Sequence, residues 1–191
     1  MTGRVLSVNV GSAEPNPARR GRGSTGFGKL PVEEAELRAP GTQGSGVLGD
    51  FIGGTGFHGG DGKAVYAFAR EELDLWEQRL GRSLPPGSFA ENLTTTGLGV
   101  DAGRVGDRWA IGDEVVLEVT SPRTPCRTFA HRMGVKGWMK TFAEHARPGT
   151  YLRVVQGGTV RPGDPIVVTA SDGVPLREVF RAVMGLDDLV R

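Results

Sequence analysis

Alternating apolar and polar positions predict a series of short β-strands. In the run RVLSVNV at 4–10, Leu6, Val8 and Val10 fall at every second position, which is typical of a strand. Two further runs predict strands: KAVYAFA at 63–69 and TYLRVVQGG at 150–158. Three Gly-Asp pairs each precede an apolar-alternating run: 106–107, 112–113 and 163–164. Short strands separated by such turns predict a closed or nearly closed β-barrel.

A change from two-residue to helical periodicity predicts a few helices. From Arg70 onward, apolar residues are spaced i, i+3 and i+7, and Gly81 then stands where a helix C-cap residue is expected. A second helix is predicted at 138–146. The clearest one covers 175–185, with one apolar stripe that we expect to dock on the barrel: Leu176, Val179, Phe180, Val183 and Met184. The predicted fold is mainly β with a few helices (α+β), as a single domain over 1–191.

Composition limits the classes of binding partner and the cellular location that can be expected. The 23 basic and 22 acidic residues nearly cancel, which argues against a nucleic-acid-binding surface. The basic run ARRGRG at 18–23 lies among Pro, Gly and Ser and is interpreted as a solvated loop. No apolar segment is long enough for a signal peptide or a membrane-spanning helix, so no membrane partner and a cytoplasmic location are expected. The 31 glycines are typical of many tight turns, and the stretch 41–62 is too glycine-dense for long regular structure.

Several motifs resemble nucleotide-binding or hydrolase sites but lack the required context. The pattern G-x-G-x-x-G occurs at 21–26, 44–49 and 54–59, yet none of the three has a strand before it and a helix after it. The stretch HGGDGKA lacks the first glycine and the Ser/Thr of a phosphate-binding loop. No G-x-S-x-G elbow is present.

The single cysteine stands in an unusual setting. Cys126 ends the stretch SPRTPC at 121–126, which follows the apolar alternation of EVVLEV. One cysteine excludes an intrachain disulfide, a Cys-rich zinc site and an iron–sulfur cluster. A nucleophilic pair of Cys126 with either His58 or His131 stays open. His145 is interpreted as a solvated residue.

Four segments together resemble the MOSC family, which is related to the C-terminal part of molybdenum-cofactor sulfurases, and in particular its YiiM-like bacterial members. They are GLGVDAGRVGD, GFHGGDGKAVYAF, PPGSFAENLTTTGL and SPRTPC, in the family's order and spacing. The resemblance implies a β-barrel of the pyruvate-kinase-barrel type. It also implies a molybdenum cofactor (Mo-molybdopterin) whose metal is bound by Cys126, a soft ligand. Pyridoxal phosphate binding is a further family-level association.

The resemblance also implies roles for the other motif residues. Arg123 and Thr124 would lie beside the pterin or its phosphate, and Asn92 and Thr94 would contact the cofactor. Glu91 would lie near the metal, and His58 is the leading candidate for a proton donor. The stretch at 58–63 adds three cofactor contacts: Gly59, Gly60 and Lys63.

Three departures from the family pattern matter. The region before HGG commonly carries a polar stretch after Gly-Asp, whereas this chain has FIGGTG there, so a different substrate access is expected. Ala90 replaces the glycine of the usual GENL, which is tolerated only if that position does not need a positive φ. The region after 185 is short compared with the helical C-terminal extension of the YiiM-like proteins.

The activity implied is reductive removal of oxygen from N-hydroxylated small molecules, with electrons from a separate redox partner. Three alternatives remain open: a carrier of the cofactor or of sulfur without turnover, a metal-free thiol enzyme using Cys126, and an RNA-binding barrel that the charge balance disfavours. A homodimer is compatible with the sequence.

Overall fold

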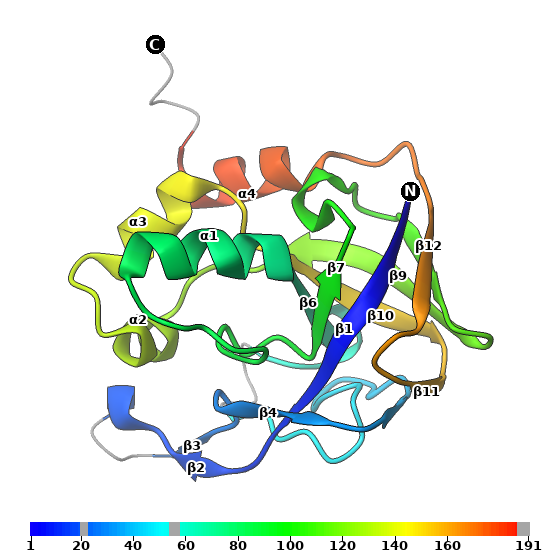
Figure 1. Ribbon diagram of the computed structural model, residues 1–191, viewed down its shortest axis with the longest axis horizontal. Coiled ribbons are helices and arrows are strands. Elements are labelled where there is room, and N and C mark those ends of the chain that lie inside the picture. Colours follow the sequence, from blue (N-terminus) through cyan, green and yellow to red (C-terminus); the bar gives the residue numbers. More distant parts are fainter. Residues whose placement is uncertain (20–22, 54–57, 187–191) are drawn as a thin grey trace.

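A closed seven-stranded barrel forms the centre of the computed structural model, which describes residues 1–19, 23–53 and 58–186 (Figure 1). Around the barrel, the strands follow the order β12, β8, β9, β10, β6, β7 and β1, and β12 pairs with β1 to close it. The bounds are β1 Thr2–Gly11, β6 Val65–Ala69, β7 Leu93–Thr96, β8 Arg108–Ile111, β9 Val115–Pro122, β10 Thr150–Gln156 and β12 Pro165–Thr169. The β6–β7 pair is parallel and the other barrel pairs are antiparallel. The predicted mainly β fold with a closed barrel is confirmed.

The barrel interior is packed with aliphatic side chains. Val115, Leu117 and Val119 of β9 are all buried, as their alternation predicts. In β1 the register shifts between Val5 and Ser7 where the strand pairs with β7, and Leu6 is left exposed instead of facing the core. Because the interior is filled by side chains, any ligand site must lie outside the barrel wall.

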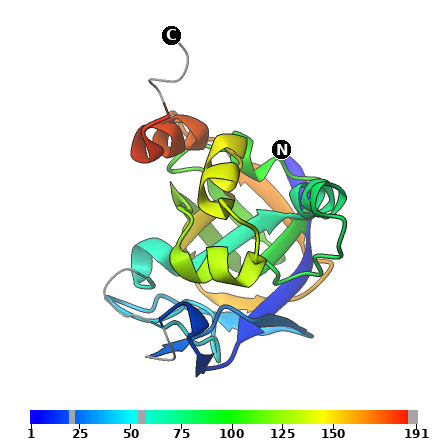
Figure 2. The ribbon, with the colours of Figure 1, turned by 90° about the vertical axis from the view of Figure 1, so that its left-hand side faces the viewer.

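Short strands extend the barrel on one side. β4 (Lys29–Val32) pairs with the second half of β1, and two small ladders join β11 (Gly158–Val160) to β5 (Ala35–Leu37) and β2 (Glu14–Pro15) to β3 (Ser24–Thr25). Three 3-10 turns lie in the connections: Pro17–Arg19, Asp61–Lys63 and Val100–Ala102. Figures 1 and 2 show β2, β3 and β4, in blue, below the barrel.

Four α-helices are present among the described residues: α1 Arg70–Leu80, α2 Arg127–Met133, α3 Trp138–His145 and α4 Leu176–Met184. The predicted ends of α1 and α4 are confirmed, since Gly81 and Gly185 adopt left-handed cap conformations. α2 was not expected from the sequence. Its seven residues carry no acidic residue in the first turn, and Cys126 at the N-cap makes no side-chain capping bond. None of the helices described is long and apolar enough to cross a membrane.

A second, aromatic core joins α1, α2 and α3 to the barrel wall. Phe89 lies at its centre, with ring centroids 4.9 Å from Phe129 and 5.0 Å from Phe68. Trp76 of α1 packs against Trp138 of α3 at 4.8 Å. This core fixes the start of α2, and therefore the backbone next to Cys126.

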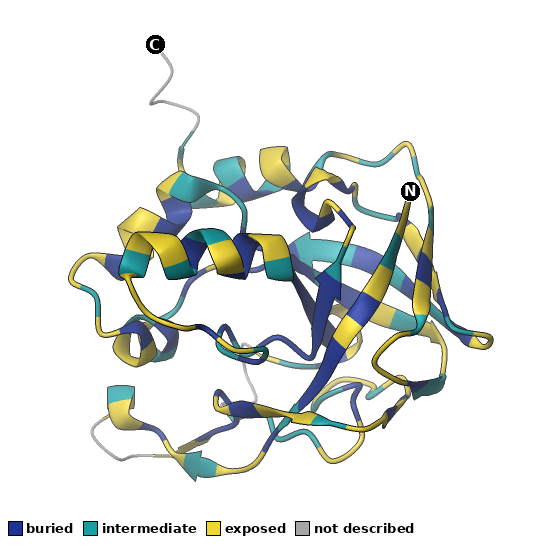
Figure 3. Cartoon of the chain, viewed as in Figure 1, coloured by how far each residue is buried: buried dark blue, intermediate teal, exposed yellow. Residues whose placement is uncertain are grey.

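α4 is docked less completely than its apolar stripe predicts. Leu176 and Phe180 are buried, but Val183 is 62% exposed and Val179 is half-buried. The alternation of buried and exposed turns along this helix can be followed at the top of Figure 3.

Candidate functional site

A cavity of about 210 Å³ opens between the barrel wall and the connections below it. Tyr66 of β6 and Tyr151 of β10 supply the barrel side. The remaining lining consists of Asn16, Arg19, 23–27, Lys29, 50–53, His58, Gly59, Lys63, Ala90, Asn92, Arg123, Thr124, Cys126 and Thr128. Of the residues expected at the site, the structure brings seven together here: His58, Gly59, Lys63, Asn92, Arg123, Thr124 and Cys126.

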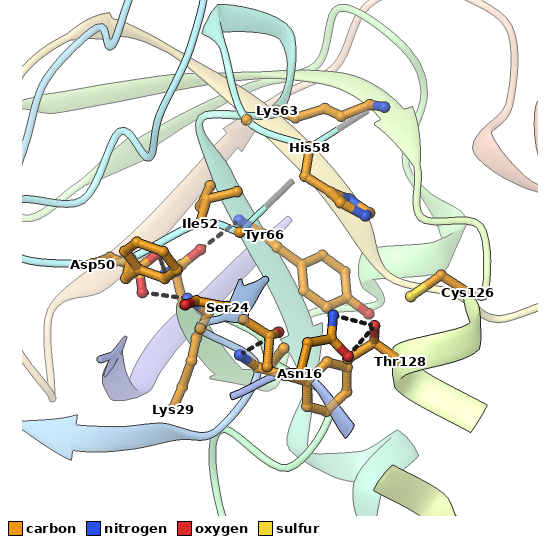
Figure 4. A pocket seen from close by; sticks show the side chains of 18 of the residues that line it. Asn16, Ser24, Lys29, Asp50, Ile52, His58, Lys63, Tyr66, Cys126 and Thr128 are labelled. Atoms are coloured by element: carbon orange, nitrogen blue, oxygen red, sulfur yellow. Dashed lines mark hydrogen bonds and ion pairs between the residues drawn. The ribbon is translucent and has the colours of Figure 1, made fainter. Parts of the chain in front are cut away.

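Cys126 lies at the N-cap of α2, four residues after β9 ends at Pro122. It is half-buried, and its sulfur reaches the cavity on the side of Thr128 and Tyr66 (Figure 4). Pro122 and Pro125 restrict the backbone before it. The thiol is therefore held at the cavity wall by a rigid connection between the barrel and the aromatic core.

Arg123 is a buried cation behind the cavity. Its guanidinium lies 4.4 Å from the Phe129 ring centroid and 4.8 Å from that of Tyr66, and it donates a hydrogen bond to the Phe89 carbonyl. Burial alone would lower the pKa of Arg123, but the Tyr66 and Tyr151 hydroxyls and the Cys126 thiol raise it. Among the described residues, no carboxylate forms an ion pair with this guanidinium, so its charge is compensated only by dipoles and rings.

His58 also lines this cavity, above Tyr66 in Figure 4. Desolvation lowers its pKa, and the positive charges of Arg123, Lys63 and Arg19 lower it further. The imidazole is therefore neutral at pH 7 in this structure. As a proton donor, the role expected from the sequence, His58 would need a negatively charged ligand in the cavity to raise its pKa.

Lys29 and Asp50 form a buried ion pair at the cavity floor that the sequence did not reveal. Asp50 also accepts hydrogen bonds from the Gly11 amide at 2.8 Å and from Ser45 Oγ at 2.8 Å. Burial lowers the pKa of Lys29 despite this partner. Lys29 begins the short strand β4 and Asp50 lies in an irregular connection, and no periodicity or motif signals a contact across these 21 positions.

Asn92 joins this floor to the barrel wall. Its amide nitrogen donates to Asp50 Oδ2 at 3.0 Å, and its amide oxygen accepts from the Tyr66 backbone N–H at 3.2 Å. It lines the cavity, as expected for a cofactor contact, but its side-chain hydrogen-bonding groups are already engaged by the protein.

Glu91 and Thr94 do not line the cavity. Glu91 is fully buried, and its carboxylate accepts hydrogen bonds from the Gly87 amide at 2.6 Å, the Phe89 amide at 3.0 Å and Thr94 Oγ1 at 2.8 Å. Burial raises the pKa of Glu91. In this structure the pair fixes the turn before β7 instead of facing a ligand.

The glycines of the 58–63 stretch also have a structural reason. A side chain at Gly59, whose φ is +82°, would place its Cβ 2.5 Å from the Gly44 carbonyl oxygen. Gly60, with φ +79°, is buried and does not line the cavity. Close packing of two loops therefore requires Gly59 whether or not an anion binds near it.

Ala90 has a φ of +62°, in the left-handed region. The condition for tolerating alanine here, that the position not need a positive φ, is therefore not met. The Cβ costs about 1 kcal/mol in this conformation. Ala90 lines the cavity, next to Glu91 and Asn92.

The other two histidines lie away from the cavity. His131 is exposed and lines neither of the cavities that contain Cys126, so of the two possible cysteine–histidine pairs the structure brings together only Cys126 and His58. His145 is not solvated as expected, because its side chain is 7% exposed and contacts Glu72 Oε2 at 2.8 Å. Arg147 contacts the other oxygen of Glu72 at 2.6 Å. With nearby Asp101, these residues form what we call the Glu72 cluster.

A second, outer cavity of about 760 Å³ adjoins the first. The two share seven lining residues: Arg19, His58, Lys63, Thr124, Cys126, Thr128 and Tyr151. Residues found only in the outer cavity include Arg127 of α2 and Val179 and Val183 of α4. Cys126 therefore lies where an inner chamber meets an outer one.

The inner chamber carries an excess of positive charge. Four cations line it, namely Arg19, Lys29, Lys63 and Arg123, and Asp50 is the one carboxylate among the described lining residues. Asp50 already pairs with Lys29. No group of three or more His, Cys, Asp or Glu side chains within the described residues could hold a metal ion. A metal bound beside Cys126 would have to bring most of its ligands with it.

The sequence and the fold of this chain are similar to those of known proteins. Residues 54–167 match the family model of the MOSC domain. The YflK protein of Bacillus subtilis strain 168 is 34% identical over 160 residues, covering 83% of this chain and 70% of the relative. A Gibberella moniliformis protein named Reductase is 33% identical over 129 residues, covering 64% of this chain but only 22% of the relative. The crystal structure of YiiM from Geobacillus stearothermophilus matches with a TM-score of 0.75 at 25% identity, covering 99% of this chain and 86% of that one.

Proposed function

Because this chain belongs to the MOSC domain family, we propose that its inner chamber binds a molybdenum cofactor and that the protein reduces N-hydroxylated compounds by removing oxygen. The observation that carries this proposal is the unbalanced positive charge around a single thiol. Four Lys and Arg side chains line the chamber, whereas Asp50 is the one carboxylate among its described lining residues and already pairs with Lys29. An anionic ligand would supply the missing negative charge.

The donor set fits such a cofactor. A cysteine thiolate is a soft ligand suited to a transition metal, and Cys126 is the one such group in the chain. A pterin dithiolene with its phosphate would bring both the remaining metal ligands and the negative charge. Arg123 is held by aromatic rings and by the Phe89 carbonyl, so its charge is preorganised and needs no rearrangement on binding.

When bound, the cofactor would supply two-electron redox chemistry and a site that accepts the substrate oxygen. The residues of this chain would then orient and protonate. Thr124 and Lys63 line the chamber beside Cys126 and would position the anionic end of the ligand. Negative charge next to His58 would raise the pKa of its imidazole, so that a proton could be held at a ring nitrogen and passed to the departing oxygen.

Relatives support redox chemistry more than simple carriage of the cofactor, because one of them is named Reductase. The matched region spans about a fifth of that protein, so its remaining length has no counterpart here. We infer that a separate redox partner delivers electrons to this protein and that it works in the cytoplasm.

The proposal is tested by the molybdenum and pterin content of protein from a cofactor-producing host. We compare the wild type with Cys126→Ser, Arg123→Met and the control Arg177→Met, an exposed arginine next to the Glu72 cluster. We expect stoichiometric molybdenum in the wild type and control, at least tenfold less metal in Cys126→Ser, and less pterin in Arg123→Met. Absence of both metal and pterin from the wild type would refute cofactor binding. Bound cofactor that is released to an apo-enzyme, without reduction of any N-hydroxylated compound, would favour a carrier.

A further inference from the structure

We propose that the outer cavity is the substrate chamber of this site, that α4 forms its apolar wall, and that it admits neutral and anionic compounds while disfavouring cationic ones. The inference that the substrate carries an N-hydroxyl group rests on the proposed function. The route to Cys126 and its charge preference rest on the described residues of the cavity alone.

Position favours this assignment. The inner and outer cavities meet at Cys126, Thr124 and Thr128, so a small molecule in the outer chamber would lie against the same thiol that faces the inner one. The outer cavity, at about 760 Å³, is the larger of the two. A compound that occupies it can reach Cys126 without entering the more crowded inner chamber.

The charges in the outer chamber have one sign. Its described lining residues include Arg19, Lys63 and Arg127 but no Asp or Glu. Arg127 is exposed, directly follows Cys126, and has no carboxylate partner among the described residues. Positive charge concentrated in a cleft attracts anions and repels cations over a distance of about 8–10 Å at ordinary ionic strength.

α4 explains the apolar side of the chamber. The stripe on this helix predicts complete docking, yet Val183 remains 62% exposed while Leu176 and Phe180 are buried. Val183 and the half-buried Val179 line the outer cavity. Their apolar surface would therefore contact a ligand that occupies the chamber.

The single cysteine allows a test that does not need the cofactor. The full chain is purified from a host that cannot make the cofactor, and Cys126 is labelled with three methanethiosulfonates whose transferred groups are neutral, anionic and cationic. In each reaction the thiolate attacks the sulfenyl sulfur, a mixed disulfide forms and methanesulfinate leaves. Dividing each rate by that of the neutral reagent removes any change in thiol reactivity. We expect the anionic reagent to react about fivefold faster than the cationic one, or more.

Two matched pairs of variants locate the effect. Arg127→Glu should lower the anion-to-cation rate ratio about fivefold or more, whereas Lys136→Glu, an equal charge change at an exposed position outside both cavities, should leave it nearly unchanged. Val183→Trp should slow a bulky aromatic reagent relative to the methyl reagent. Ala182→Trp, at an exposed α4 position that does not line the chamber, should not.

Equal rates for the two charged reagents, or equal ratios in Arg127→Glu and Lys136→Glu, would overturn the charge selection. Equal effects of the two tryptophan variants would overturn the role of α4. Because these rates are measured without molybdenum, they stand or fall separately from the metal content that tests the proposed function.

Discussion

The two chambers at Cys126 and the Glu72 cluster both collect positive side chains, but they differ in how many carboxylates lie beside them. Glu72 accepts from His145 and Arg147, and Asp101 accepts from the Gly149 amide at 2.8 Å. In the chambers, the described lining residues include five Lys and Arg side chains and one carboxylate, that of Asp50, which pairs with Lys29. Balanced charges are typical of structural networks, whereas an excess of one sign of charge around a cavity indicates where a ligand of opposite sign would bind.

The largest expected effect comes from breaking the one ion pair in the inner chamber. Asp50→Asn leaves the buried Lys29 ammonium without a counter-charge, which should lower the free energy of unfolding by about 3–5 kcal/mol. Urea unfolding followed by tryptophan fluorescence measures it. The double variant with Lys29→Met should recover part of the loss in a double-mutant cycle. A loss below about 1 kcal/mol for Asp50→Asn would mean that Asp50 is not needed to balance Lys29.

A smaller, pH-dependent effect is expected in the Glu72 cluster. Desolvation raises the pKa of Asp101 to about 6, above its ordinary 3.8, so the folded state loses stability as pH rises from about 4 to 6. Asp101→Asn removes this penalty and keeps an oxygen that can accept from Gly149. It should therefore be more stable than wild type by about 1–3 kcal/mol at pH 7–8, and the difference should shrink toward pH 4.

Glu72→Gln is the control for Asp101→Asn, because the pKa of Glu72 is shifted in the opposite direction. Desolvation alone would raise the pKa of Glu72, but the hydrogen bonds from His145 and Arg147 outweigh it and lower the pKa below 4.5. Glu72 therefore stabilises the fold above pH 4.5, and that contribution is lost as pH falls through its folded-state pKa. The variant should be less stable than wild type at pH 7 and approach it in acid. Parallel pH profiles for the two variants would contradict both assignments.

The smallest effect concerns backbone conformation. Ala90→Gly removes a Cβ from a residue at φ +62° and should raise the free energy of unfolding by about 0.5–1 kcal/mol. Ala182→Gly, on the exposed face of α4, should instead lower it by about 0.5–1 kcal/mol. Thermal unfolding of both variants checks this, and destabilisation by Ala90→Gly would show that the Ala90 methyl group contributes more by packing than it costs in conformation.

Regular features of the fold could be predicted because local pattern alone encodes them. The alternation of Val115, Leu117 and Val119 marks a barrel strand, and Gly81 and Gly185 mark helix ends. The bulge that exposes Leu6 arises from pairing with β7, which no local pattern reports. α2 escaped prediction because it is short and lacks a capping side chain.

The site could be predicted only where it lies in continuous motifs. Cys126, Arg123 and Thr124 lie in one stretch, and the structure places all three at the inner chamber. Lys29 and Asp50 could not be found, because their contact depends on how an irregular connection folds against the start of β4. For Glu91, the sequence motif does not distinguish a carboxylate that faces a ligand from one that fixes a turn, as Glu91 does.

The closure of the barrel has a consequence for how the protein is made. Thr2 of β1 pairs with Val167 of β12, and Figure 1 shows the blue β1 and the orange β12 side by side at this seam. On the ribosome, β1 emerges well before β12, because Val167 lies 165 positions after Thr2. Until then β1 exposes an unpaired edge for several seconds at ordinary rates of synthesis. Closing so long a loop is also slow, so we expect this protein to depend on chaperones during translation more than a helical protein of equal length.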